Sequence, residues 1–572
     1  MKKINKQQSI GSTKIKSTNK VHKTLLLRIE EALINNERIV FYSLCTICLV
    51  FSLFLFNARV SEGNDDSLYI EAGYNYAHDF ANYAYTANAP FYPLFLGGMT
   101  ALFGVNLIVF KLSSVLFNFL GVVLLYKSFK DRIPYIILFT VSFLVASNSY
   151  FQYFASQTYT ESLYLFLQFA YLFYFFKVID KIDNEEDLTR REHWPLWLLS
   201  SGFLFIMIMA RNASVAIIPA IILFFVFIKK YKYILWSIGS LLAYTIPYEI
   251  IHTLLWKQKD QYSGQSKILL LKDPYNASKG NDDIAGFVSR FFDNIQLYLS
   301  KRFFQVLGFF SDNYSQTNVI WSLVVITLVT VGFIKALRSK NRALFFSVIY
   351  MASIVLLTFI IIQARWDQPR LIMIHMPIML ITILFGLHGL VKKSSYSQNL
   401  FVLVCIILLS SSFISSTKKS SDNFPVVLKN LKGDKFYGYT PDWVNFFKMS
   451  EWCADSLSDT ALVASRKASM SFVYGKGRKF FPVYKVVALD TTTGYSNPDS
   501  VLMYFKKSKV SHVILASLRR DPSKADGNII NTLERMIKPI AQKYPEKIQF
   551  VHQIPAQDQA QIEPAYLYKI VY

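Results

Sequence analysis

Charged residues and cysteines are both scarce in this sequence. Asp, Glu, Lys and Arg make up 17% of the 572 residues, whereas a typical soluble domain has about 25%. The four cysteines are too few for a disulfide framework. Two of them, Cys45 and Cys48, lie in an apolar run, where we expect them to pack as small hydrophobic residues. No cluster of His and Cys has the spacing of a metal site, so we expect no metal ion and no other cofactor.

Long apolar runs are abundant instead. Hydrophobic residues make up 53% of the chain, and the mean hydropathy is +0.29. Runs of about 17–22 apolar residues alternate with short charged segments, which is the pattern of transmembrane helices. This pattern excludes a soluble enzyme, a disordered chain and a disulfide-stabilised scaffold. The eleven predicted spans lie near residues 39–57, 107–126, 133–150, 161–178, 194–211, 213–229, 234–255, 317–335, 343–362, 370–391 and 400–416.

Basic residues outnumber acidic ones by 61 to 38, which gives a formal charge of +23. Eight basic residues precede the first acid, Glu30, within an N-terminal arm of residues 1–38. The connections predicted to share its side of the membrane, such as 127–132 and 335–342, all carry Lys or Arg. Cytoplasmic loops are enriched in this way. We therefore predict a cytoplasmic arm, a lipid bilayer as the surrounding medium, and no nucleic acid partner.

The segment 417–572 has the composition of a soluble domain, and alternating helices and apolar strands predict an α/β fold. Eleven spans that begin in the cytoplasm end outside it, so this domain is predicted to be extracytoplasmic. The predicted fold class is thus an α-helical polytopic membrane protein, spanning at 39–416, with a C-terminal extracytoplasmic α/β domain. The predicted helices are 441–457 and 498–509, and the predicted strands are 461–465, 511–517, 548–554 and 565–572.

Two connections on the outer side are themselves apolar. Residues 90–104, PFYPLFLGGMTALFG, contain Pro and Gly and predict a short helix at the membrane interface. Residues 284–310 space aromatic residues at helical intervals, with Arg290, Lys301 and Arg302 opposite them. Amphipathic helices of this kind lie in the headgroup plane. We expect both segments to rest on the outer surface of the bilayer.

Charged residues at the outer ends of spans require an explanation, because burying them in a membrane is costly. Asp65 and Asp66 follow the first span, and Glu161 opens the fourth. Arg211 closes the fifth span, and the outer turn that leads into the tenth carries Arg365, Asp367 and Arg370. If the helices form a bundle, these side chains converge on one outward-facing cavity that contains both carboxylates and guanidinium groups.

The segments that carry these residues resemble the GT-C superfamily of membrane glycosyltransferases, which includes protein O-mannosyltransferases and the aminoarabinose transferases of lipid A. NDDSLYIEAGYNYA with NAPFYPLFLGGMTALFG is similar to the first external loop of that superfamily, which has an acidic pair, then Tyr, then a Pro-containing aromatic stretch. TYTESLYLF resembles its second external loop, which carries an acid. ARNASVAIIPAI and QPRLIMIHMPIML resemble later motifs, and SDTALVASRKASMSFVYGKGRKFFP resembles the external domain of bacterial members.

The resemblance implies an inverting transfer of a sugar from a polyprenyl-phosphate donor to a hydroxyl of a protein, lipid A or a glycan, on the periplasmic face of a bacterial inner membrane. Asp65 matches the leading acid of the family pair and would act as the general base. The family often has Glu where this chain has Asp66, so the choice between the two acids stays open. Arg211 and Arg370 would bind the donor phosphate. Glu161 would orient the acceptor or the sugar.

A transporter or flippase of lipid-linked glycans is the alternative interpretation. Transporters place charged sites near the membrane midplane, on broken helices within repeated halves. Here the candidate charges are predicted at outer helix ends, the sequence has no internal repeat, and an external domain follows the spans. These features favour an enzyme.

Overall fold

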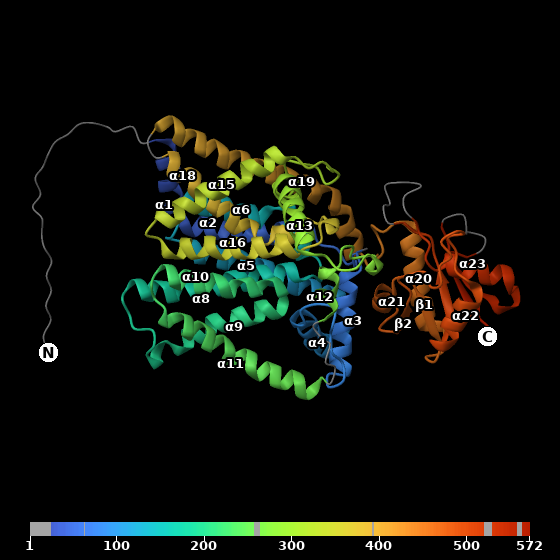
Figure 1. Cartoon of the computed structure of the whole chain (residues 1–572). Coiled ribbons are helices and arrows are strands. Elements are labelled where there is room, and N and C mark those ends of the chain that lie inside the picture. Colours follow the sequence, from blue (N-terminus) through green and yellow to red (C-terminus); the bar gives the residue numbers. More distant parts are fainter. Residues whose placement is uncertain (1–23, 62, 257–262, 392–393, 520–528, 557–562) are drawn as a thin grey trace, which may run out of the picture.

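The computed structural model describes residues 24–61, 63–256, 263–391, 394–519, 529–556 and 563–572. Figure 1 shows a bundle of long helices with a smaller α/β domain at one end. Helix α1 (Leu25–Asn35) lies at the opposite end of the bundle. Helix α1 and the C-terminal domain therefore lie at opposite ends of the bundle.

Eight helices in the described part of the chain are long and apolar enough to cross a membrane. A ninth candidate span is the pair α6 (Tyr135–Ser147) and α7 (Ser149–Ala155), which is bent by 50°. Two further predicted spans coincide with shorter apolar helices, α10 (Ile217–Phe227) and α18 (Met376–Val391). The count of eleven stays a prediction. The eight long helices are α2 (Glu37–Phe54), α5 (Leu107–Phe129), α8 (Thr160–Asp183), α9 (Trp194–Ala210), α11 (Lys232–Leu255), α15 (Val319–Arg338), α16 (Arg342–Ile361) and α19 (Ser395–Leu431).

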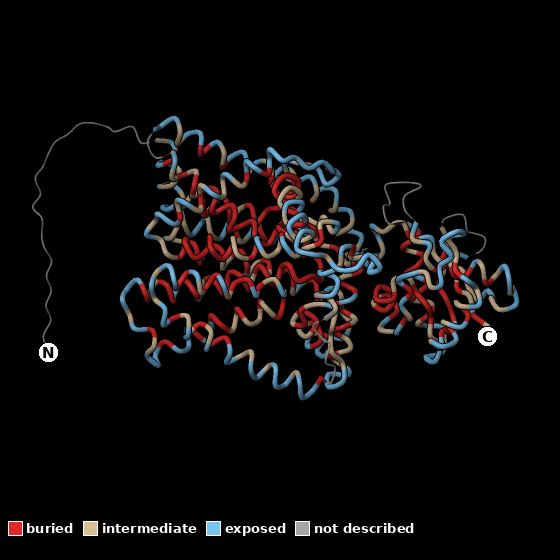
Figure 2. Tube along the Cα trace, viewed as in Figure 1, coloured by how far each residue is buried: buried red, intermediate tan, exposed pale blue. Residues whose placement is uncertain are grey.

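Burial distinguishes the central helices from the peripheral ones. In α8, 78% of the apolar window is buried within the protein, against 17% in α11 and 22% in α2. Figure 2 shows the buried residues concentrated along the middle of the bundle. Small residues permit close contact between helices. Helices α15 and α18 approach each other so closely that a Cβ on Gly332 of α15 would lie 2.1 Å from the carbonyl oxygen of Thr382 in α18. Helix α8, which begins with Glu161 in its first turn, thus forms the core of the bundle.

Short elements cap the bundle on the side of the C-terminal domain. The predicted helix within 90–104 is α4 (Phe91–Phe103), which packs on α3 (Asp65–His78). Residues 284–310 form α13 (Ile284–Gln296), a π-helix (Leu297–Arg302) and α14 (Phe303–Val306). The remaining capping helices are α12 (Ser263–Leu270), a 3₁₀ turn (Ala364–Trp366) and α17 (Arg370–Met373).

The basic residues of 284–310 are buried rather than directed at headgroups. Arg290 pairs with Asp282, while Lys301 and Arg302 both bind Asp367. The opposite side of α13 exposes Ile284 and other apolar residues. Its apolar stripe fits a bilayer surface, and its position at the interface stays a prediction.

The C-terminal domain is a three-layer α/β unit. Its five-stranded sheet has the order β2-β1-β3-β7-β6, with β1, β2 and β3 parallel and β7 antiparallel to both β3 and β6. Helices α20 and α21 cover one face, and α22 and α23 cover the other. Helix α19 continues past residue 416 to Leu431 and connects the bundle to this domain. The elements are α20 (Pro441–Ser456), β1 (Leu462–Ser465), α21 (Ala468–Tyr474), β2 (Phe480–Pro482), α22 (Pro498–Lys507), β3 (Val510–Leu515), β4 (Leu518–Arg519), β5 (Ile529–Ile530), α23 (Glu534–Lys543), β6 (Ile548–Ile554) and β7 (Ala565–Ile570).

Candidate active site

Four of the five predicted site residues form one alternating chain of charges. Arg370 Nη2 donates to Asp65 Oδ2 at 2.5 Å. Glu161 Oε1 lies 4.0 Å from Arg370 Nε and 3.4 Å from Arg211 Nη2. The order across the site is therefore Arg211, Glu161, Arg370, Asp65. Each guanidinium is next to a carboxylate, so the cluster is balanced before any ligand binds.

Local backbone features place Asp65 and Arg370 at the mouth of the bundle. Asn64 adopts a left-handed conformation (φ 76°), and α3 begins at the next residue. Asp367 is also left-handed (φ 34°), and its carboxylate accepts from Lys301 Nζ at 2.6 Å and from Arg302 Nε at 2.7 Å. These two ion pairs fix the turn that leads into α17, where Arg370 is the first residue. Asp367 is thus bound outside the charge cluster, and so is Arg365, which pairs with Asp273.

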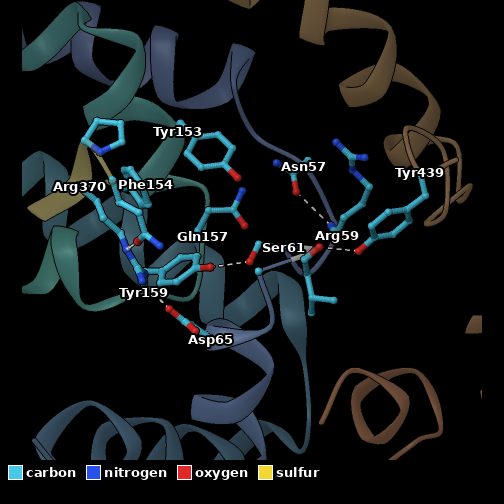
Figure 3. A pocket seen from close by; sticks show the side chains of 14 residues that line it. Asn57, Arg59, Ser61, Asp65, Tyr153, Phe154, Gln157, Tyr159, Arg370 and Tyr439 are labelled. Atoms are coloured by element: carbon cyan, nitrogen blue, oxygen red, sulfur yellow. Dashed lines mark hydrogen bonds and ion pairs between the residues drawn. The ribbon is translucent and has the colours of Figure 1, made fainter. Parts of the chain in front are cut away.

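The Arg370 guanidinium is held on three sides. Besides the bond to Asp65, its Nε donates to Gln368 Oε1 at 2.6 Å, and its Cζ lies 5.0 Å from the centroid of the Tyr159 ring. The Tyr159 hydroxyl is 2.5 Å from Ser61 Oγ (Figure 3). Arg370 is thus oriented before ligand binding, which lowers the entropic cost of gripping an anion.

Two cavities meet at the Asp65–Arg370 pair. The first, called the polar cavity here, has a volume of about 480 Å³ and is lined by Arg59, Ser61 and Gln157, among others (Figure 3). The second, called the apolar cavity, has a volume of about 510 Å³ and contains Glu161 and Arg211. Asp65, Gln368 and Arg370 line both. The walls of the apolar cavity include Leu68, Leu269, Leu357, Ile361, Ile362, Leu371 and Ile374.

The apolar cavity contains polar atoms that lack partners. Glu161 Oε2, Arg211 Nη1 and His375 Nδ1 are buried and make no hydrogen bond within the described residues. Buried polar groups are normally satisfied, and leaving one unpaired costs about 1–3 kcal/mol. The cavity thus combines unpaired polar atoms with aliphatic walls. This combination indicates a ligand that is itself part polar and part apolar.

Asp66 is placed differently from Asp65. The Asp66 side chain is fully buried and lines neither cavity. Its Oδ2 accepts from the Ser61 amide at 2.6 Å, and its Oδ1 accepts from the Ser67 amide at 2.9 Å. Burial raises the pKa of Asp66 above that of an ordinary aspartate. By contrast, 42% of the Asp65 side chain is exposed, so Asp65 is the member of the pair that a substrate can reach.

The C-terminal domain completes the polar cavity. Tyr439 lines it, and its hydroxyl donates to the Val60 carbonyl at 2.5 Å. Arg59 stacks over the Tyr439 ring at 5.0 Å. In α21 of the same domain, Ser469 Oγ donates to Glu71 Oε2 of α3 at 2.5 Å. The domain therefore holds the segment that leads to Asp65.

Sequence reasoning did not identify several of these residues. Arg59 and Gln368 lie within six residues of predicted site residues, so their closeness in the sequence could have identified them. Tyr439 lies far along the chain and outside the segments that carry the resemblance, so nothing in the sequence marks it. In the described residues, no group of three or more His, Cys, Asp or Glu side chains could hold a metal ion.

No protein-family model matches the sequence, and no curated protein matches it. Solved structures do match the chain. ArnT from Cupriavidus metallidurans bound to undecaprenyl phosphate matches with a TM-score of 0.54 and 12% identity, over 94% of this chain and 98% of its own. Its apo state matches with a TM-score of 0.53, 11% identity and the same coverage. The archaeal oligosaccharyltransferase AglB from Archaeoglobus fulgidus, in complex with an inhibitory peptide and a dolichol-phosphate, matches with a TM-score of 0.53 and 12% identity, over 84% of this chain and 70% of its own.

Similarity at this level of identity shows a shared fold. Both proteins have the GT-C architecture, so the resemblance predicted from the loop motifs is confirmed at the level of the fold. The chain is an integral membrane protein with a GT-C fold.

Proposed function

We propose that this protein is an inverting glycosyltransferase that moves a sugar from a polyprenyl-phosphate donor to a hydroxyl acceptor. The observation that carries the proposal is the Asp65–Arg370 pair, which two separate cavities share. A base beside a phosphate-binding cation, open from both sides, is the arrangement that a displacement at a sugar carbon needs. The fold similarity to ArnT and AglB supports the same class of reaction.

The apolar cavity suits the donor. Its aliphatic walls match the first units of a polyprenyl chain, and Arg211 and Arg370 can grip the phosphate. The unpaired Arg211 Nη1 is available for a phosphate oxygen. Glu161, whose Oε2 is also unpaired, would accept from a sugar hydroxyl. These roles use the polar atoms that the fold leaves open.

The acceptor would enter through the polar cavity, on the other side of Asp65. Its hydroxyl oxygen forms a bond to the anomeric carbon while the bond from that carbon to the phosphate oxygen breaks. The hydroxyl proton passes to Asp65, and the electron pair leaves with the phosphate. Phosphate is a good leaving group, so no general acid is needed. The cations stabilise the negative charge that grows on it as the bond breaks. Attack from the opposite side of the carbon inverts its configuration.

We also propose that the active site faces the periplasm of a bacterial inner membrane. The basic N-terminal arm, the basic connections and the position of the site near the C-terminal domain support this orientation.

A turnover assay tests the proposal against the transporter or flippase alternative. Purified full-length protein is mixed with polyprenyl-phosphate sugars and a panel of Ser/Thr peptides, lipid A and glycans. We expect release of polyprenyl phosphate and an inverted glycosidic bond in one acceptor. Movement of the lipid-linked sugar across proteoliposomes, without transfer to any acceptor, would contradict the proposal and favour the alternative.

A further inference from the structure

The polar cavity is backed by a buried cation that the proposed mechanism does not use. Lys111 lies in the second turn of α5, and its side chain is fully buried. An ionisable residue inside a membrane helix is costly and usually functional. Lys111 forms no ion pair within the described residues. Its three N–H donors go instead to the Ser156 carbonyl at 2.9 Å, Asn57 Oδ1 at 2.9 Å and Gln157 Oε1 at 3.2 Å.

Two of the acceptor residues, Asn57 and Gln157, line the polar cavity, and Lys111 fixes the orientation of their amide groups. An ammonium can only donate, so it requires the carbonyl end of each amide. Asn57 Oδ1 also accepts from the Arg59 amide at 3.2 Å, which occupies its second lone pair. The ends that remain for the cavity are the NH₂ groups of Asn57 and Gln157, although Gln157 Nε2 also donates one hydrogen to Ser156 Oγ at 3.4 Å. Lys111 thereby converts two amides, which could serve as donors or acceptors, into donors.

Two guanidinium groups add further donors to this cavity, beside hydroxyl groups that can donate or accept. Arg59 and Arg370 line it, and neither has an acceptor function. Among the described residues that line the cavity, Asp65 is the one carboxylate, and it is paired with Arg370. Asp66 lies behind the same loop, and its oxygens accept from Ser61 and Ser67. The cavity therefore offers several converging hydrogen-bond donors.

We infer that the polar cavity is an oxyanion site, in which the Lys111-oriented amides of Asn57 and Gln157, together with Arg59, bind a phosphate or diphosphate group. Phosphate oxygens are acceptors only, so this lining complements them. The site is separate from the Arg211–Glu161 end of the apolar cavity. If the proposed transferase function is correct, the occupant is either the phosphate of the carrier or a phosphate group on the acceptor.

Isosteric replacement of the two amides by carboxylates tests the site with little change in packing. The full-length protein is titrated with inorganic pyrophosphate by isothermal calorimetry. Asn57→Asp places a carboxylate against Lys111 and removes the NH₂ donor, and Gln157→Glu does the same. We expect each variant to bind pyrophosphate at least about tenfold more weakly, with its thermal unfolding temperature maintained because a new ion pair replaces a hydrogen bond.

Asn88→Asp is the matched control, because it makes the same exchange on the wall of the apolar cavity. It should change the pyrophosphate affinity by less than about threefold. Wild-type affinity in both Asn57→Asp and Gln157→Glu, or no binding to the wild-type protein, would overturn the inference. Since no turnover is measured, failure of the glycosyltransferase proposal does not affect this result.

A second titration identifies the occupant. The protein is first saturated with a short-chain polyprenyl phosphate and then titrated with pyrophosphate. Loss of pyrophosphate binding assigns the site to the carrier phosphate. Undiminished binding supports a second anion site and assigns it to a phosphate-bearing acceptor.

Discussion

Replacing Asp65 with Asn separates its chemical role from its structural one. Asn has the same shape, and its Oδ1 can still accept from Arg370 Nη2, which now donates to Asp65 at 2.5 Å. The Asp65 side chain is 42% exposed, and a pair that is exposed to this extent contributes at most about 1 kcal/mol to stability. The variant should therefore fold normally and unfold within a few degrees of the wild type.

Activity should respond much more strongly than stability. An amide cannot take the proton of the acceptor hydroxyl, and loss of a general base lowers the rate by about 10²–10⁴. That range corresponds to about 2.7–5.4 kcal/mol of transition-state stabilisation. The decrease should appear in kcat, while binding of the donor, which depends on the two arginines, is largely kept. Single-turnover measurements on purified protein, beside donor binding by calorimetry, provide both numbers.

Asp66→Asn is the matched control, because it makes the same change one residue later. Asp66 accepts two backbone N–H bonds in a buried position, and the amide introduced by the substitution would direct an NH₂ group at one of these donors. We expect a loss of stability of about 1–3 kcal/mol and a smaller effect on kcat. An active Asp65→Asn protein with an inactive but folded Asp66→Asn protein would show that Asp66 is the base. Full activity in both variants and in the double variant would refute the reasoning, because the acidic pair would then be ordinary loop.

Local patterns were sufficient to predict most of the elements. Apolar runs identified the positions of the eight long helices, of the bent pair α6 and α7, and of α10 and α18, and the Pro- and Gly-containing stretch identified α4. In the C-terminal domain, α20, α22 and β6 match their predicted segments within a few residues. These signals are strong because hydrophobic periodicity is a property of neighbouring residues. Helix ends were less predictable, as α19 shows by continuing past the apolar run to Leu431.

Partners were much harder to predict than positions. The sequence placed Lys301 and Arg302 on a polar face, and the structure shows that this face is occupied by Asp367, 65 residues beyond Arg302 along the chain. Lys111 lies within a predicted apolar span, where one basic residue hardly changes the hydropathy of a window. Its significance depends on Asn57 and Gln157, which come from two other segments. Such roles arise only when the chain has folded.

Three further predictions follow from charge and burial. A reporter that is active only in the cytoplasm, fused after Tyr572, should be silent, and a bright signal would contradict the predicted topology. Burial, together with nearby positive charges, lowers the pKa of His512 in the C-terminal domain. The unfolded chain then binds the extra proton first, so stability should fall as the pH drops through about 6.5. In His512→Gln, the unfolding temperature, followed by tryptophan fluorescence, should fall less between pH 7 and 5, and an equal fall would exclude this group. Arg211→Ala and Arg370→Ala should each lower turnover by about 10²–10³, as for loss of an oxyanion donor. The larger loss is expected for Arg370, because its guanidinium faces both cavities and contacts Asp65. Lys at either position should restore part of the activity, since an ammonium keeps the charge but loses the two-pronged geometry. Wild-type turnover in both alanine variants would remove the two arginines from the mechanism, and equal activity of Lys and Arg would show that charge alone is sufficient.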